Sequence, residues 1–478
     1  MSDLDMNLNR IPEEVKTVHF MGICGTGMGS LAGMLKETGF QVTGSDMQVY
    51  PPMSTFLEFL GIPVFKGYGA ANLEHGPDLV IVGNVITRQN EEAIALAERR
   101  IPFVSFPQAL NHFFLASKVS IVVAGTHGKT TTSSLLASIL DSAGLDPGCM
   151  IGGIVQGFGR NYRLGTGKYF VVEGDEYDTA FFDKGPKFLH YKPDMAILTS
   201  VEFDHADIYE DFDAVKAAFR SLVRIMPPNG VLVAYEDADA VREVVGDAEC
   251  HIVGYGQGGG QDLSWTLKDC SVEGQKTKFS VLKDGRAYGE FISPLLGVHN
   301  ALNTVSVIAI LDRIGLAREE IQAGLSAFKG IRRRQEVRGV KNGITIMDDF
   351  AHHPTAVRET LSALRLAYPD NRLVAVFEPR TNSSRRKVFQ QEYALSFDCA
   401  DCIIVRDAPG LEKIPPEERF SSRTLVEDLT ARNKKAYYFP DTGGIVEFLL
   451  KRSVPGDVLA IMSNGGFDNI HQELLERL

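Results

Sequence analysis

The residues with the clearest chemical capacity are Gly125-Thr-His-Gly-Lys-Thr-Thr131, which follow an apolar, β-branched run at 121–123. The run predicts a buried strand, and residues 131–140 predict a helix. Gly125 and Gly128 let the backbone turn tightly and approach a ligand without a Cβ atom in the way. Free N–H groups and the positive end of the helix dipole then face an anion. The segment therefore predicts a phosphate-binding loop.

Two side chains of this loop fit a nucleotide. Lys129 would reach the β- and γ-phosphates, and the hydroxyl of Thr130 would ligate Mg²⁺. The loop is shorter than the general pattern, because two residues rather than four separate Gly125 from Gly128. The alternative is an ordinary strand–turn–helix that carries a surface lysine.

Two acidic clusters follow predicted strands. The strand at 169–173 leads into Glu173-Gly-Asp-Glu-Tyr-Asp178, and the strand at 195–200 leads into Glu202-Phe-Asp-His-Ala-Asp207. Ligands of an α/β sheet bind at the carboxyl ends of its strands, where carboxylate and imidazole groups suit Mg²⁺ beside a nucleotide. Solvated acidic loops are the alternative.

A second glycine loop, Gly22-Ile-Cys-Gly-Thr-Gly-Met-Gly29, lies between a predicted strand at 15–22 and a predicted helix at 30–38. Asp46 ends the next predicted strand, so the segment imitates the dinucleotide fingerprint without its third glycine. This loop predicts that a phosphate group binds near residues 22–29, but it does not identify the ligand that carries the phosphate. A nicotinamide-dependent oxidoreductase is one alternative that it raises.

Strands and helices alternate along most of the chain, which predicts an α/β protein with successive domains. A doubly wound unit ends near residue 116, and the segment 328–336 reads as a hinge into a third unit. Between them we expect a glycine-rich loop at 256–260, a hairpin at 276–291 and a helix that runs to about residue 314.

Composition limits the class of protein. A chain of 478 residues is too long to fold around a single hydrophobic core, so we expect two to four domains. The net charge of −12 argues against a non-specific nucleic-acid binder. No apolar stretch approaches the ~20 residues that span a bilayer, and residues 1–14 lack the apolar centre of a secretory signal. Six scattered cysteines favour a reducing, cytoplasmic location.

Four motifs resemble those of the Mur ligases, in order and rough spacing across nearly the whole chain. They are the loop 125–131, Asp204-His205, the pair Asn300 and Asn303, and Asp348-Asp-Phe-Ala-His-His-Pro354. Members of this family join an amino acid or a peptide to a UDP-muramoyl carboxylate with ATP. The resemblance implies a Rossmann-like UDP-substrate-binding domain, a central P-loop ATPase domain and a Rossmann-like peptide-binding domain. We expect these at residues 1–116, 117–329 and 330–478.

Three further stretches are similar to one branch of the family. They are Tyr50-Pro-Pro-Met-Ser54, Glu173-Gly-Asp-Glu-Tyr-Asp-Thr-Ala-Phe-Phe-Asp-Lys184 and Met462-Ser-Asn-Gly-Gly-Phe467. That branch attaches the tripeptide L-alanyl-γ-D-glutamyl-meso-diaminopimelate to UDP-N-acetylmuramate, through an acyl phosphate, in peptidoglycan recycling. The implied partners are UDP-N-acetylmuramate, ATP and the murein tripeptide, with Mg²⁺ as cofactor and neither nucleic acid nor membrane. The branch that adds L-alanine to UDP-N-acetylmuramate is the main alternative, and a non-catalytic nucleotide sensor is another.

The resemblance also implies roles for particular residues. Catalytic roles fall to Lys129, Glu173, His205 and Arg334, and Mg²⁺ ligation falls to Thr130, Glu173 and His205. The expected ATP-binding residues are Gly125, Thr126, His127, Gly128, Lys129, Thr130, Thr131, Asn300, Asn303, Arg334 and Asp349. The expected UDP-substrate-binding residues are Gly22, Gly25, Thr26, Gly27 and Asp46. Arginine forks suit peptide carboxylates, and the candidates are Arg380, Arg385 and Arg386 after a strand of the third domain. Arg220 occupies the position of a carbamylated lysine in some members, so we expect none here.

Overall fold

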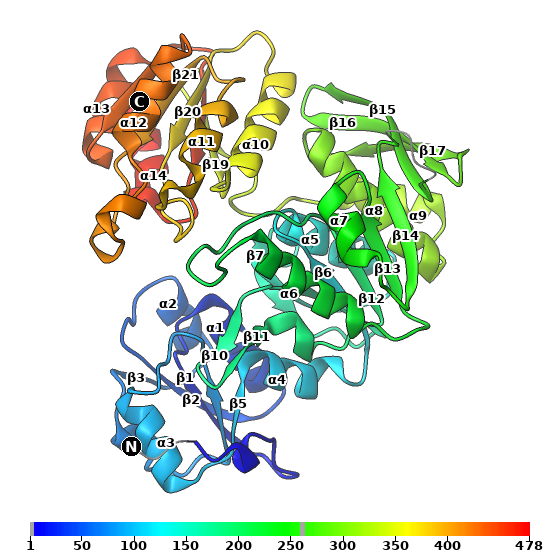
Figure 1. Cartoon of the computed structure of the whole chain (residues 1–478), viewed down its shortest axis with the longest axis vertical. Coiled ribbons are helices and arrows are strands. Elements are labelled where there is room, and N and C mark those ends of the chain that lie inside the picture. The colour runs from blue at the N-terminus through cyan, green and yellow to red at the C-terminus, as the bar shows by residue number, and fades with distance from the viewer. Residues whose placement is uncertain (1–3, 259–262) are drawn as a thin grey trace.

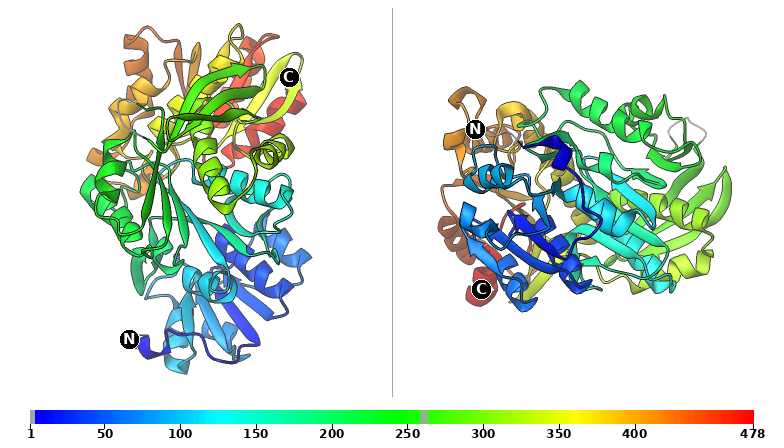
Figure 2. Two further views of the ribbon diagram at one scale, coloured as in Figure 1. Left: turned by 90° about the vertical axis from the view of Figure 1, so that its right-hand side faces the viewer. Right: turned by 90° about the horizontal axis from the view of Figure 1, so that it is seen from below.

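The computed structural model describes residues 4–258 and 263–478, and it contains three α/β units in series along the long axis (Figure 1). The N- and C-terminal ends lie toward opposite ends of that axis, as the left view of Figure 2 also shows. Residues 259 and 260 of the expected glycine-rich loop lie outside the described residues. Within the described ranges, no helix has the length and apolar character that crossing a bilayer requires.

The N-terminal unit is built on a parallel sheet of order β3-β2-β1-β4-β5. Side chains of its strands alternate between a face that α1 covers and a face that α3 covers. Its elements are β1 (Thr17–Met21), α1 (Thr26–Glu37), β2 (Gln41–Asp46), α2 (Met53–Phe59), β3 (Val64–Lys66), β4 (Leu79–Val82), α3 (Glu91–Arg99), β5 (Phe103–Ser105) and α4 (Phe106–Leu110).

The central unit has the longest sheet, of order β17-β16-β15-β14-β13-β12-β6-β9-β7-β8. Its parallel part places β6 between β9 and β12, and the strands from β15 to β17 form antiparallel hairpins. The first elements are β6 (Val119–Ala124), α5 (Lys129–Ser142), β7 (Gly148–Val155), β8 (Arg160–Arg163), β9 (Tyr169–Gly174), β10 (Asp178–Ala180), β11 (Asp183–Pro186), β12 (Met195–Leu198) and α6 (Phe212–Arg224). The others are β13 (Val231–Tyr235), α7 (Asp239–Val245), β14 (His251–Gly256), β15 (Trp265–Glu273), β16 (Lys276–Lys283), β17 (Arg286–Ser293), α8 (Val298–Ile314) and α9 (Arg318–Ala327).

Alternation along β6 decides which helices cover the central sheet. Ile121 and Val123 are fully buried with the apolar residues of α5, α8 and α9. Val122 and Ala124 point to the other face, where α6 and α7 pack. Because β6 is buried on both faces, it is a continuous apolar run rather than an alternating one.

The C-terminal unit has the order β18-β19-β23-β20-β21-β22, and only β18 runs antiparallel to its neighbour among the described strands of this sheet. One face packs against α10, α11 and α12 and the other against α13 and α14. Its elements are β18 (Glu336–Lys341), β19 (Ile344–Asp349), α10 (Pro354–Ala367), β20 (Leu373–Phe377), α11 (Gln390–Ser396), β21 (Cys402–Arg406), α12 (Ser422–Ala431), β22 (Ala436–Phe439), α13 (Thr442–Arg452), β23 (Val458–Met462) and α14 (Ile470–Arg477).

The mixed α/β fold with three successive sheets is the one that the sequence predicts. The predicted domain limits fall between α4 and β6 and between α9 and β18, and as limits they stay predictions. Two helix starts were placed too late, because α1 begins at Thr26 rather than at residue 30 and α5 begins at Lys129 rather than at residue 131.

A buried histidine makes the stability of the C-terminal unit sensitive to pH. His471 of α14 lies with its Nε2 3.5 Å from Asp348 Oδ1 of β19. Burial lowers the pKa of His471 from 6.5 to about 4, although the nearby Asp348 opposes this shift. Between these values the unfolded chain binds a proton that the folded chain does not, so stability is lost as the pH falls.

We expect a fall from pH 7 to pH 5 to cost about 1–2 kcal/mol of unfolding free energy through His471. His471→Asn should remove this share of the pH dependence, measured by urea unfolding at both pH values. His251→Asn changes an exposed histidine at the start of β14 and serves as the control. Equal pH dependence in the wild type and His471→Asn would contradict the expectation.

Candidate active site

The phosphate loop joins β6 to α5 in the conformation that its glycines permit. Gly125 has φ +132° and Gly128 has φ +80°, both in the region that favours glycine. A Cβ atom on Gly125 would lie 2.2 Å from Thr199 Oγ1, and one on Gly128 would lie 2.9 Å from Asn303 Oδ1. Lys129 is the first residue of α5, so the loop ends at a helix N-terminus that favours an anion.

The acidic clusters meet this loop because of the strand register. Ala124 at the end of β6 pairs with Gly174 of β9 on one side and with Leu198 of β12 on the other. The carboxyl ends of the three strands therefore lie side by side at the point where the chain changes direction across the sheet. Ligands of open α/β sheets bind at such a point.

Lys129 is held among carbonyl and carboxylate oxygens. Its Nζ donates to Gly125 O at 2.7 Å and to Glu176 Oε2 at 2.9 Å. Burial opposes the charge of the ammonium group, but Glu176 and Asp175 outweigh it and raise the pKa of Lys129. Lys129 is therefore a buried cation that is paired with Glu176, and its contact with phosphates stays a prediction.

Thr130 and Glu173 supply hard oxygen atoms next to the lysine. Thr130 Oγ1 lies 3.2 Å from Glu173 Oε2, and the Gly152 N–H donates to Glu173 Oε1 at 2.6 Å. Burial and the neighbouring Asp175 raise the pKa of Glu173. Burial disfavours the charged form of the Glu173 carboxylate. A divalent cation bound between this carboxylate and the Thr130 hydroxyl would stabilise that charged form.

His205 follows β12 in a left-handed conformation, with φ +54°. Its Nε2 lies 3.6 Å from Glu176 Oε1, so Glu176 lies between His205 and Lys129. Its ring centroid is 5.0 Å from that of Tyr177. The role of His205 as a metal ligand stays a prediction.

The linker into the C-terminal unit, residues 328–335 between α9 and β18, reaches the phosphate loop. Arg334 Nη2 donates to Thr130 Oγ1 at 3.3 Å, and its guanidinium lies over the ring of Phe350. Asp349 at the end of β19 accepts from the backbone N–H of Gln335 at 2.7 Å and of Ala351 at 2.8 Å. The carboxylate of Asp349 therefore fixes the linker, and contact with a nucleotide stays a prediction.

The two asparagines of α8 lie where the linker and the phosphate loop meet. Asn300 donates to Leu296 O at 2.8 Å and lies 3.4 Å from Gln335 Oε1. Asn303 packs against Gly128 and donates to Asn300 Oδ1 at 3.4 Å. Sequence spacing correctly places both on one face of the helix.

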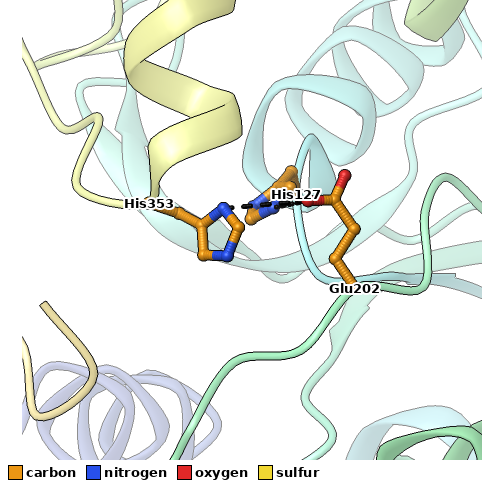
Figure 3. A group of neighbouring side chains, drawn as sticks. All are labelled: His127, Glu202 and His353. Atoms are coloured by element: carbon orange, nitrogen blue, oxygen red, sulfur yellow. Dashed lines mark ion pairs between the residues drawn. The ribbon is translucent and has the colours of Figure 1, made fainter. Parts of the chain in front are cut away.

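The sequence patterns did not predict a further group of side chains that meets at this edge of the central sheet. His127 Nε2 lies 3.4 Å from Glu202 Oε2, and His353 Nδ1 lies 3.8 Å from the same oxygen (Figure 3). Thr126 ties the loop to this strand end, because its hydroxyl accepts from the Glu202 N–H at 2.9 Å. Glu202 and His353 do lie in motifs that the sequence marks, yet nothing in their spacing predicts that they meet.

Of the three candidate peptide-binding arginines, Arg380 is the most available. Its side chain is 45% exposed and lies 3.7 Å from the buried Glu378. Arg385 donates to the carbonyls of Pro409 and Gly410, and Arg386 pairs with Glu418. These two arginines therefore hold their own loop together, and their peptide contacts stay predictions.

Gly465 forms the surface on which Arg380 lies. A Cβ atom there would stand 2.4 Å from Arg380 Cδ. Arg333 of the linker holds the same loop, since it donates to Ser463 O at 2.6 Å and to Gly465 O at 2.5 Å. The stretch 462–467 thus positions Arg380 beside the carboxyl end of β23.

The N-terminal glycine loop connects β1 to α1. Gly25 precedes α1 as its N-cap, with Thr26 and Gly27 in the first turn. Gly22 donates to Ser45 O at 2.9 Å, and Cys24 N–H donates to Asp46 Oδ2 at 2.9 Å. Asp46 therefore shapes the loop from the neighbouring strand, and its contact with a UDP substrate stays a prediction.

Models of protein families match three segments of the chain. A model described as "Mur ligase family, catalytic domain" matches residues 17–118. The "Mur ligase middle domain" matches residues 123–311, and the "Mur ligase, glutamate ligase domain" matches residues 333–465. The matched segments follow the three sheets in order.

Individual relatives match over nearly the full length. The chain is 41% identical over 465 residues to UDP-N-acetylmuramate–L-alanyl-γ-D-glutamyl-meso-2,6-diaminoheptandioate ligase of Escherichia coli K12, covering 96% of this chain and 98% of the relative. It is 34% identical to UDP-N-acetylmuramate–L-alanine ligase of Acetivibrio thermocellus, covering 97% of each. The crystal structure of a murein peptide ligase from Psychrobacter arcticus is similar with a TM-score of 0.71 and 35% identity, over 96% of this chain and 98% of that one.

Proposed function

Since the chain belongs to the Mur ligase family, we propose that it joins L-alanyl-γ-D-glutamyl-meso-diaminopimelate to UDP-N-acetylmuramate and converts ATP to ADP and phosphate. The relatives that attach this tripeptide include the one that is 41% identical, whereas the alanine-adding relative from Acetivibrio thermocellus is 34% identical. The observation that carries the reaction class is the convergence of Lys129, Thr130 and Glu173 at one sheet edge.

The reaction needs an activated carboxyl group, because a free carboxylate is a poor acyl donor. Transfer of the γ-phosphoryl group of ATP to the muramoyl carboxylate forms an acyl phosphate and ADP. The free amine of the tripeptide attacks the acyl carbon, and the tetrahedral species then loses phosphate to leave the amide. Catalysis of such a step is mainly positioning and charge neutralisation.

The chain supplies these functions from its sheet edge. Lys129 would exchange its partner Glu176 for the β- and γ-phosphates. Bound Mg²⁺ would supply further neutralisation of phosphate charge, with Thr130, Glu173 and His205 as its proposed ligands. Arg334 already contacts the loop through Thr130, so the linker closes the site from the C-terminal side and excludes water.

The amine substrate would enter from the C-terminal unit. The tripeptide carries several carboxylates, and Arg380 offers an exposed guanidinium on the Gly465 surface. Arginine binds carboxylates with two parallel hydrogen bonds. The UDP-linked substrate would lie on the N-terminal unit near Gly22, Gly25 and Thr26. Both nucleotide substrates belong to the cytoplasm, where we place the protein.

A phosphate-release assay tests the reaction class. Release should require UDP-N-acetylmuramate, ATP, Mg²⁺ and tripeptide together, and the product should have the mass of the amide. A nucleotide sensor would bind ATP without release. Release that continues without the peptide and yields no amide would contradict ligation.

The contact between Gly465 and Arg380 gives a sharper test of the amine site. We expect Gly465→Ala to displace the Arg380 side chain and to lower kcat/KM for the tripeptide by about 10–100-fold, as would Arg380→Ala, because a charge-assisted pair is lost. The KM for ATP should change little. Gly466→Ala is the matched control, since no atom lies within 4 Å of a Cβ there. Equal kinetics in all three variants would remove Arg380 from the amine site.

A further inference from the structure

His127, Glu202 and His353 form a compact donor set beside the phosphate loop, apart from the Thr130–Glu173 pair. One atom of each lies within 4.8 Å of the others. Figure 3 shows the three side chains converging from the phosphate loop, from the segment after β12 and from the start of α10. We propose that this group binds a divalent transition-metal ion of the Zn²⁺ type, with two imidazoles and one carboxylate as ligands.

The chemistry of the donors fits such an ion. Two histidines and one glutamate form a known three-ligand zinc arrangement that leaves a position for water. The separations of 3.4 Å and 3.8 Å from Glu202 Oε2 to the imidazole nitrogens are close to those between ligands of one small ion. Two imidazoles among three ligands favour an ion of the Zn²⁺ type over the harder Mg²⁺ and Ca²⁺, whereas the Thr130–Glu173 pair offers oxygen atoms alone.

A buried nitrogen in this group lacks a hydrogen bond. His127 Nε2 is buried and makes no hydrogen bond of good geometry among the described residues, although Glu202 Oε2 lies 3.4 Å away. Such an atom costs free energy unless a ligand satisfies it. Because it faces the Glu202 carboxylate, a cation between the two would satisfy both groups.

The surrounding residues orient the ligands in the manner of a metal site. His353 Nε2 lies 3.1 Å from Phe203 O, so this nitrogen carries the proton and Nδ1 keeps its lone pair. Thr355 Oγ1 donates to Glu202 Oε2 at 2.6 Å and holds the carboxylate. Metal-bound histidines generally donate their other N–H to a carbonyl or a carboxylate.

Access to the set also agrees. Glu202 keeps 36% of its side chain exposed, which leaves a path for an ion.

The ligands come from two units of the fold, so occupancy has a structural consequence. His127 and Glu202 belong to the central unit, and His353 is the N-cap residue of α10 in the C-terminal unit. An ion bound to all three holds these units against each other. Binding of the ion would break the 3.3 Å hydrogen bond that the Thr355 N–H donates to His353 Nδ1.

Titration of the full-length, metal-free protein with Co²⁺ and Zn²⁺ tests the site without any substrate. We expect visible absorption bands of a low-coordinate Co²⁺ site, displaced by one equivalent of Zn²⁺, and a thermal midpoint that Zn²⁺ raises. Glu202→Gln and His353→Ala should each weaken binding at least about tenfold and remove the bands. His251→Ala, on the exposed start of β14, should keep both.

If His353→Ala does not fold, the test rests on Glu202→Gln, because glutamine preserves the shape of the glutamate side chain. Unchanged bands and affinity in Glu202→Gln would overturn the proposal. Absence of a one-equivalent site in the wild type would do the same. Neither result bears on the ligase reaction, which is measured separately.

Discussion

Lys129→Ala should lower kcat for amide formation at least ~10³-fold, because the phosphates of ATP lose the cation that neutralises them in the transition state. The lysine has the geometry for this role, since it begins α5 and its Nζ lies among Gly125 O and Glu176 Oε2. The variant should remain folded at 25 °C. Turnover near that of the wild type at saturating ATP would refute the assignment.

Loss of Lys129 also leaves the buried Glu176 carboxylate without its cation, and this cost must be separated from catalysis. Glu176 is 2% exposed, so an uncompensated charge there is destabilising. The double variant Lys129→Ala/Glu176→Gln should recover stability in urea unfolding and stay inactive. Recovery of activity in the double variant would mean that Lys129 acts on the fold only.

Glu173→Gln should reduce turnover about 10²–10³-fold and shift its Mg²⁺ dependence to higher concentrations, since one hard ligand is lost. His205→Ala should act in the same direction. Initial rates against Mg²⁺ at fixed ATP give the measurement. Because burial raises the pKa of Glu173, the neutral amide should cost little stability.

Glu210→Gln makes the same change of charge at an exposed position near the second acidic cluster, so it controls for long-range electrostatics. Its Mg²⁺ dependence should match the wild type. If Glu173→Gln and His205→Ala keep both their rates and their Mg²⁺ dependence, these residues are structural. The phosphate-loop assignment would then stand without a metal role for β9 and β12.

Local patterns were enough to predict several strands and the glycine turn between β6 and α5. The expected strands at 121–123 and 169–173 lie within β6 and β9, because buried β-branched runs between polar turns favour the extended conformation. The helix α1 shows where local propensity fails. Glycines argue against a helix start at Thr26, but a Cβ on Gly29 would lie 2.3 Å from Met53 Sδ, so packing selects glycine there.

Contacts between units could not be predicted from the sequence. Glu202 and His353 meet because the start of α10 lies against the segment after β12, and no spacing rule covers residues of separate domains. The arginines show the same limit, since three neighbours in one loop have different partners. Arg385 binds backbone carbonyls and Arg386 binds Glu418, while Arg380 lies against Gly465.

The ratio of kcat/KM for the tripeptide to kcat/KM for L-alanine tests the central claim most directly. It is measured by coupled phosphate release with UDP-N-acetylmuramate, ATP and Mg²⁺ held saturating. The proposed function predicts a ratio of at least ~10², because the carboxylates beyond the alanyl residue contribute binding in the transition state. A ratio below one would contradict it and make the protein an alanine-adding ligase.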